Sequence, residues 1–283
     1  MKNGKVPAAE PKEVDLLSMQ SRLVQSTAED RNLDRAIRSA HPSSIAALRS
    51  NACGDTIDVL VGYTAGALAQ NGGDTLSMVA DISSAVCQAG QYMRNSGIEP
   101  VFRLAGTAKV PDNSSGSAVA DLQALSNFQD GWNDSLLDAM LSAEADMLAL
   151  IVEDGREWGK QWCGNAWIMQ EASLGFATTK NFGTYSVSSL WCIKNTETLT
   201  HELGHNLGMH HYSEIVNEGS GGLFDDSCGW KWNGHRSIMA HPPGNRVNLF
   251  SNPSLGAGAP GVADNARTGN ISAPIASCFS DAR

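Results

Sequence analysis

Residues 201–211 read HELGHNLGMHH, with histidines at positions 201, 205, 210 and 211. Two histidines four residues apart lie on one face of an α-helix, so the imidazoles of His201 and His205 can reach the same metal ion. Gly208 is a typical helix stop, because glycine accepts the left-handed conformation in which many helices end. The chain can then turn and bring a third ligand, His211. We therefore expect a helix that ends near Gly208 and a metal site made of these three histidines.

The chemistry of such a site follows from its ligands. Three neutral imidazoles leave a zinc ion one open position for water, which is the arrangement of catalytic rather than structural zinc. Glu202, beside the first ligand, can accept a proton from that water and pass it to the leaving group. A bare HExxH can occur by chance, whereas HExxHxxGxxH fixes five positions within eleven residues. The pattern predicts metal-assisted hydrolysis with Glu202 as the general base.

The residues around the motif favour the same helix. Asn195 is a candidate N-cap, and Glu197 would lie in the first turn, where the helix dipole favours a negative charge. Leu199, Leu203 and Leu207 form a stripe with a spacing of four residues. We expect this stripe to face the core and the histidines to face a cleft.

Apolar runs alternate with segments of helical spacing up to residue 211. The segments 76–95 and 118–144 are predicted to be helical, the second with a break at 132–134. Strands are predicted at 57–63, 101–110, 146–152, 164–169 and 185–192. This alternation favours an α/β fold. After His211 the sequence is rich in Gly, Pro and Asn, and we expect irregular structure there.

The chain divides near residue 50. Residues 1–50 are rich in charge, lack cysteine and show short amphipathic helical patterns, so they are either the tail of a propeptide or a helical extension. Residues 51–283 form the expected main domain. No apolar run matches a signal peptide or a membrane span, so for an exported protein we expect the precursor to begin upstream.

Charge and cysteine content bound the partners and the compartment. The formal net charge is −10, which argues against nucleic acid and anionic membranes, because both are polyanions. Charged residues make up 18%, which suits an extracellular protein with long loops. The six cysteines form no CxxC pair, and an even count favours three disulfides in an oxidising compartment over six buried thiols.

The histidine motif resembles that of the metzincin zinc peptidases. These enzymes have a turn with a methionine some tens of residues after the third histidine, and Met239 in the sequence SIMA at 237–240 resembles it. A closer resemblance is to bacterial reprolysin-like enzymes, especially the peptidyl-Asp metallopeptidases. The similar segments are 58–64, 163–167, 236–240 and 246–253.

The resemblance implies a fold and a function. It implies an α/β (α+β) metzincin fold, with a twisted five-stranded mixed sheet, an active-site helix and an irregular C-terminal subdomain. It also implies a secreted, monomeric zinc endopeptidase that cleaves extended polypeptides by means of one catalytic Zn²⁺; a Ca²⁺ requirement stays open. The alternatives are a processing protease or toxin of narrow specificity, and a non-catalytic binding module on the same fold.

Further residues take expected roles from the resemblance. The edge strand that pairs with the substrate would contain Gly164, Asn165, Ala166 and Trp167. Specificity for aspartate would require a basic residue near the methionine turn. The candidates are Arg236 and Arg246, although we favour an ordinary surface role for both.

Two positions depart from the family pattern. Tyr212 follows the third histidine where reprolysins usually have Asp. His241 stands where many metzincins have a tyrosine two residues after the turn methionine. His241 could donate a hydrogen bond to a tetrahedral intermediate, but we favour an ordinary loop histidine.

The sequence alone allows fifteen disulfide pairings. Cys163 and Cys192 begin and end segments that we expect to be neighbouring strands, so they are the first expected pair. By elimination and chain order, the remaining pairs are expected to be Cys53 with Cys87 and Cys228 with Cys278.

Overall fold

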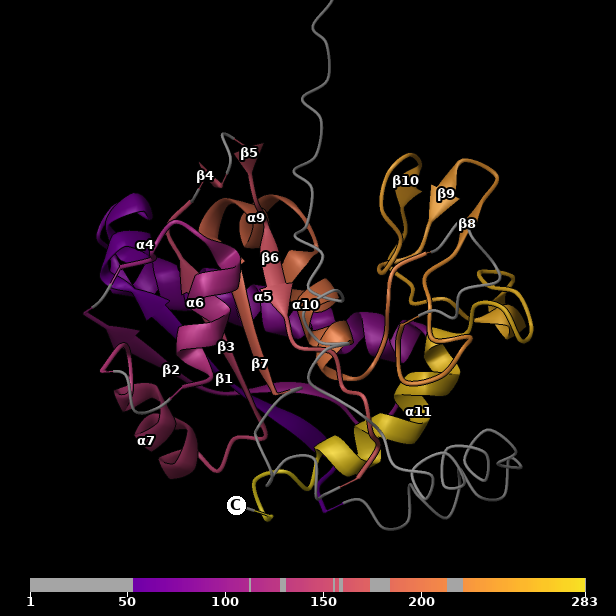
Figure 1. The fold of residues 1–283 in the computed structure, drawn as a ribbon, viewed down its shortest axis with the longest axis horizontal. Helices are drawn as coiled ribbons and strands as arrows, with labels where there is room; N and C mark the ends of the chain where they lie inside the picture. The colour runs from indigo at the N-terminus through magenta and orange to yellow at the C-terminus, as the bar shows by residue number, and fades with distance from the viewer. Residues whose placement is uncertain are drawn as a thin grey trace, which may run out of the picture.

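The computed structural model describes residues 53–111, 113–127, 131–154, 156–157, 160–173, 184–212 and 221–282. The predicted helical segment at 1–50 lies outside these residues. The described part forms an α/β structure around one five-stranded sheet (Figure 1). The expected α/β fold class is confirmed.

The central sheet is mixed. Its strand order is β2-β1-β3-β7-β6, and the pairs β1–β2, β1–β3 and β3–β7 are parallel. β6 runs antiparallel to β7 and lies at the edge of the sheet. The strands are β1 (Thr56–Thr64), β2 (Val101–Val110), β3 (Met147–Val152), β6 (Gly164–Ala166) and β7 (Tyr185–Ser189).

Helices cover both faces of this sheet. The core on one face contains residues of α5 (Thr75–Asn95) and α10 (Thr198–Asn206). The core on the other face contains residues of α6 (Ala118–Leu125) and α7 (Ser135–Ser142). β3 is buried along its whole length because it packs against both layers, which explains its continuous apolar run.

The helix α5 shows how its sequence specifies its ends and its buried face. The Asp74 side chain accepts a hydrogen bond from the backbone N–H of Leu76 and so caps the first turn. Met78, Ile82 and Val86 follow at intervals of four residues and are fully buried. This spacing places one apolar stripe against the sheet.

Shorter elements complete the described part. Beside the sheet lie α4 (Ala65–Gln70), α9 (Leu190–Asn195) and the hairpin of β4 (Arg156–Glu157) with β5 (Lys160–Gln161). The C-terminal part contains β8 (Lys231–Trp232), β9 (His235–Arg236), β10 (Asn245–Arg246), η1 (Pro253–Leu255) and α11 (Asn265–Ala276). Most of this part is irregular, as expected. The sequence analysis did not predict the helix α11.

Three local predictions were wrong. The segment 185–192 is a strand only to Ser189, and the helix α9 begins at Leu190. The predicted strand at 164–169 keeps ladder pairing only over β6. Asn195 is the last residue of α9, so it cannot cap α10; Glu197 occupies the N-cap and makes no side-chain capping hydrogen bond.

The cysteines pair differently from the expectation, except at one bridge. Cys163 and Cys192 form a disulfide, as predicted. Cys53 pairs with Cys278, and Cys87 and Cys228 are free thiols, so the pairs Cys53–Cys87 and Cys228–Cys278 and the total of three were wrong. Chain order failed because α11 carries the C-terminal segment back to the start of β1, where the Cα atoms of Cys53 and Cys278 lie 4.8 Å apart.

No helix in the described ranges is both long and apolar enough to span a membrane.

The two free thiols should differ in reactivity. Cys87 is exposed on α5, whereas Cys228 is buried and donates a hydrogen bond to the Val262 carbonyl at 3.0 Å. Burial, together with the nearby Asp226 carboxylate, raises the pKa of the Cys228 thiol to about 11. Because the thiolate is the reactive form, iodoacetamide at pH 8 should modify Cys87 in the native protein and Cys228 only after unfolding. Peptide mass spectrometry measures both sites, and a peptide linking Cys53 to Cys87 would contradict the structure.

Candidate metal centre

The helix α10 presents its two histidines because its opposite side is apolar. Leu199, Leu203 and Leu207 are buried in the core on the α5 face of the sheet, as predicted. Leu207 is the C-cap, and Gly208 follows with φ +81°, a conformation that favours glycine. The predicted helix stop is confirmed.

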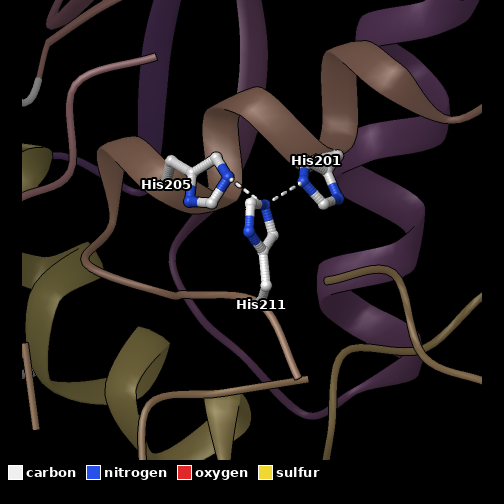
Figure 2. A group of neighbouring side chains, drawn as sticks. All are labelled: His201, His205 and His211. Atoms are coloured by element: carbon white, nitrogen blue, oxygen red, sulfur yellow. Dashed lines mark hydrogen bonds between the residues drawn. The ribbon is translucent and has the colours of Figure 1, made fainter. Parts of the chain in front are cut away.

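Three imidazoles converge beyond this stop (Figure 2). The Nε2 atom of His211 lies 3.0 Å from Nε2 of His201 and 2.9 Å from Nε2 of His205. All three candidate ligand atoms lie within 4.8 Å of one another. His201 and His205 come from α10, and His211 comes from the loop that follows it (Figure 2). The structure thus brings together the three histidines that the spacing had singled out.

Backbone carbonyls orient the imidazole rings of the two histidines on α10. Nδ1 of His201 lies 2.9 Å from the carbonyl oxygen of Ile238, and Nδ1 of His205 lies 2.8 Å from that of Met209. A carbonyl only accepts hydrogen bonds, so each Nδ1 carries the hydrogen, and in a neutral imidazole the Nε2 atom then keeps its lone pair. Two lone pairs therefore face Nε2 of His211, which carries at most one hydrogen. This donor set fits a zinc ion held by three neutral imidazoles.

The side chain of Glu202 extends from α10 towards the edge strand β6. Glu202 is buried, with 2% of its surface exposed to solvent. A Cβ atom placed on Gly164 would meet the Glu202 carboxylate, with Cδ and Cγ both at 2.8 Å. Position 164 must therefore be glycine for the Glu202 side chain to keep its place. The sequence analysis had assigned Gly164 to substrate pairing only and missed this role.

The methionine turn contacts α10 between the two ligands. Met239 is fully buried, and its Sδ lies 2.7 Å from the place that a Cβ on Gly204 would occupy. Gly204 stands between His201 and His205 on the helix, and the carbonyl of the neighbouring Ile238 holds His201. Met239 thus packs against the backbone of the helix that carries the histidines.

Among the described residues, no strand pairs with the side of β6 opposite β7, and we call this side the free edge. The Cys163 carbonyl accepts from the N–H of Ser189, and the N–H of Trp167 donates to Tyr185, so both groups point towards β7. Backbone groups alternate in direction along a strand. The N–H and C=O groups of Gly164 and Ala166 therefore point away from β7, to the free edge. Trp167 itself lies just beyond the strand.

A buried asparagine that the sequence analysis missed joins this edge to the helix. The Nδ2 group of Asn206, the last residue of α10, donates to the Trp167 carbonyl at 2.9 Å and to the Tyr185 carbonyl at 3.0 Å. Asn206 is fully buried. An asparagine inside an otherwise apolar face was the signal that could have pointed to this contact.

Two more histidines border the cluster. The ring of His241 lies 4.1 Å from that of His211 and 6.0 Å from that of His201, centroid to centroid. The ring of His210 lies 4.8 Å from that of His211. His241 lies in a loop, and this loop brings its ring beside those of His211 and His201.

The two candidate arginines do not have the surface role that we favoured. Arg236 is 3% exposed, and its guanidinium donates to the carbonyls of Gly244 and Ala240 at 2.9 and 2.8 Å. The side chain of Arg246 is 14% exposed, and its Nη1 lies 3.1 Å from Oε2 of Glu197. Arg236 thus donates hydrogen bonds to the backbone of its own loop, whereas Arg246 forms an ion pair with Glu197 at the start of α10.

Comparison with known proteins matches the chain to one family. The sequence model of a protein family described as metallo-peptidase family M12, of reprolysin type, matches residues 54–251. The chain is 29% identical over 213 residues to a peptidyl-Asp metalloendopeptidase of Stenotrophomonas maltophilia, a match that covers 71% of this chain and 46% of that protein. It is 28% identical over 215 residues to a peptidyl-Asp metalloendopeptidase of Xanthomonas campestris, covering 74% and 47%.

The chain thus spans about half the length of the curated relatives it matches. A solved structure described as a chaperone–substrate complex has a TM-score of 0.60 at 18% identity, and the match covers 80% of this chain and 36% of that one. At this identity the likeness concerns the fold alone.

The close approach at Gly164 yields a stability prediction. Gly164→Ala should lower the free energy of unfolding by about 1–3 kcal/mol, because the new methyl group collides with the buried Glu202. Gly106→Ala in β2 is the matched control, since its Cβ would lie 3.5 Å from the nearest atom, Leu60 Cδ1. Urea unfolding followed by tryptophan fluorescence measures both variants; equal stabilities would show that Glu202 does not occupy this space.

Proposed function

Because the chain belongs to metallo-peptidase family M12, we propose that it is a zinc-dependent endopeptidase. The proposed catalytic domain comprises residues 51–283. The family match ends at residue 251, but α11 contributes Ile271 and Ala273 to the same core as α10. We therefore include the C-terminal helix in the proposed domain. Nothing in the cluster of histidines requires a residue from a second copy, so we propose that the enzyme acts as a monomer.

The convergence of three imidazoles beside a buried carboxylate carries this proposal. His201, His205 and His211 would hold the ion, since their Nε2 atoms already face one another. When bound, zinc polarises a substrate carbonyl and makes water a stronger nucleophile at neutral pH. Glu202, next to His201 in the chain, takes a proton from the attacking water and delivers it to the leaving amine.

The free edge of β6 provides the proposed substrate site. An extended peptide would add as a further strand, with main-chain hydrogen bonds to Gly164 and Ala166. Glu202 packs against this strand, so its carboxylate would lie beside a peptide bound there. Main-chain pairing accepts many sequences, and selectivity must come from side-chain contacts elsewhere.

The relatives suggest what that selectivity is. Both curated relatives are named peptidyl-Asp metalloendopeptidases, and we propose cleavage next to aspartate for this chain as well. The two disulfides favour an oxidising compartment, so we further propose that the enzyme is secreted.

Substitution of the proposed base and of one proposed ligand separates catalysis from metal binding. Glu202→Gln should retain about one zinc per chain and lose about 10²–10⁴-fold in kcat on casein or a peptide, because the proton acceptor is gone. His211→Asn should lose the metal as well. The matched control is His210→Asn, an adjacent histidine outside the three. Plasma emission spectrometry gives the zinc content.

Each alternative function has its own outcome in this experiment. Full activity in Glu202→Gln would remove Glu202 from the mechanism. Zinc in the wild-type protein without any peptide hydrolysis would favour a non-catalytic binding module. Unchanged zinc content in His211→Asn would contradict the proposed ligand set.

A cleavage profile tests the proposed selectivity. Digestion of a proteome-derived peptide library, read by mass spectrometry, should place aspartate next to most cleaved bonds. A profile without enrichment of acidic residues would leave the peptidase and reject the aspartate preference. Cleavage of a single library sequence would favour a processing enzyme of narrow specificity.

A further inference from the structure

We infer that Arg246 recognises the acidic side chain of the substrate and that Glu197 holds its guanidinium in position. The inference rests on the proposed peptidase function and gives its selectivity a structural basis. It concerns an ion pair at the start of α10, the helix that carries His201 and His205, rather than the histidines themselves.

Two sets of contacts connect Arg246 to residues that hydrogen-bond His201. Its Nη1 lies 3.1 Å from Oε2 of Glu197. The Glu197 carbonyl accepts from the N–H of His201 at 3.0 Å, so the two residues are one helical turn apart, a rise of about 6 Å. The ion pair therefore lies at the start of α10, one turn before His201.

The second contact runs through the loop that carries the methionine turn. Arg246 in β10 pairs with Arg236 in β9, and the N–H of Ile238 donates to the Leu249 carbonyl at 2.9 Å. The segment of Arg246 thus runs along the segment whose Ile238 carbonyl holds His201. Both routes link Arg246, through other residues, to groups that hydrogen-bond His201.

The guanidinium has hydrogen-bonding capacity left. An arginine carries five N–H donors, and within the described residues one ion pair engages Arg246, that with Glu197. Its Nε atom is buried and has no hydrogen-bond partner there. Arg236 is the contrasting case, because carbonyls of its own loop satisfy its Nε and Nη1 groups. Arg246 has the donors with which an arginine binds a carboxylate through two parallel hydrogen bonds.

The surroundings strengthen this interaction. The Arg246 side chain is 14% exposed and that of Glu197 is 29% exposed, so water screens the pair only partly. Glu197 also acts on its other neighbour, since burial first and the Glu197 charge second raise the pKa of Tyr92. A bound acidic side chain would share the guanidinium with Glu197, whereas a basic side chain would face the positive charge of Arg246.

The competing explanation is a purely structural tie between β10 and α10. A structural tie would affect all substrates equally, whereas recognition would affect acidic substrates alone. The test therefore compares kcat/KM for two peptides that differ only at the residue next to the cleaved bond, Asp in one and Asn in the other.

Arg246→Gln should lower the Asp-to-Asn ratio of kcat/KM by about ten- to a hundredfold, the effect of losing a hydrogen bond to a charged group. The Asn peptide should be cleaved within about threefold of the wild-type rate, because it makes no such contact. Arg246→Lys keeps the charge without the planar fork and should retain part of the ratio. Glu197→Gln should also lower this ratio, because the guanidinium loses the carboxylate that holds it in position.

Arg267→Gln is the matched control. Arg267 also pairs with a carboxylate, its Nη1 lying 2.9 Å from Oδ1 of Asp226, in the cleft lined by Asp264 and Pro253. Its loss should leave the ratio unchanged. Thermal unfolding checks that each variant is folded, and if Arg246→Gln is not, Arg246→Lys and Glu197→Gln still decide the question.

The outcomes separate the inference from the function on which it rests. Equal losses for both peptides in Arg246→Gln would overturn recognition and support the structural tie. A wild-type enzyme that cleaves both peptides equally would overturn the inference and leave the peptidase standing. Failure of the wild-type enzyme, with zinc bound, to cleave any peptide would reject the function itself.

Discussion

Two backbone carbonyls, those of Ile238 and Met209, determine the chemistry available to the histidine cluster. Each accepts the Nδ1 hydrogen of a ring on α10 and so directs the Nε2 lone pair towards His211. These carbonyls come from the methionine turn and from the segment after the helix stop. The orientation of the rings therefore depends on the fold of the loops as much as on the helix.

Much of this arrangement could be predicted from the sequence. The spacing of residues 201–211 indicated the helix, its stop at Gly208 and the meeting of three histidines, because helical periodicity and glycine conformation are local properties. Apolar periodicity likewise located α5 and the strands β1, β2 and β3. The role of the histidines as ligands and of Glu202 as base stays a prediction.

The rest depended on contacts between distant segments. The buried face of α11 consists largely of small or polar residues such as Ala266, Gly269 and Ser272, so its periodicity carries no strong apolar signal. Without α11 the return of the C-terminus to Cys53 could not be foreseen. Neither could the space that Gly164 leaves for Glu202, nor the reach of Arg246 to Glu197, since each joins elements far apart in the chain.

The bridge between Cys53 and Cys278 closes a covalent ring of nearly the whole described chain. A single backbone cut at any loop inside this ring opens it without releasing a fragment. A peptidase that cleaves its own copies during storage would therefore keep its apparent mass and separate into pieces only after reduction. Intactness of such a preparation has to be judged under reducing conditions.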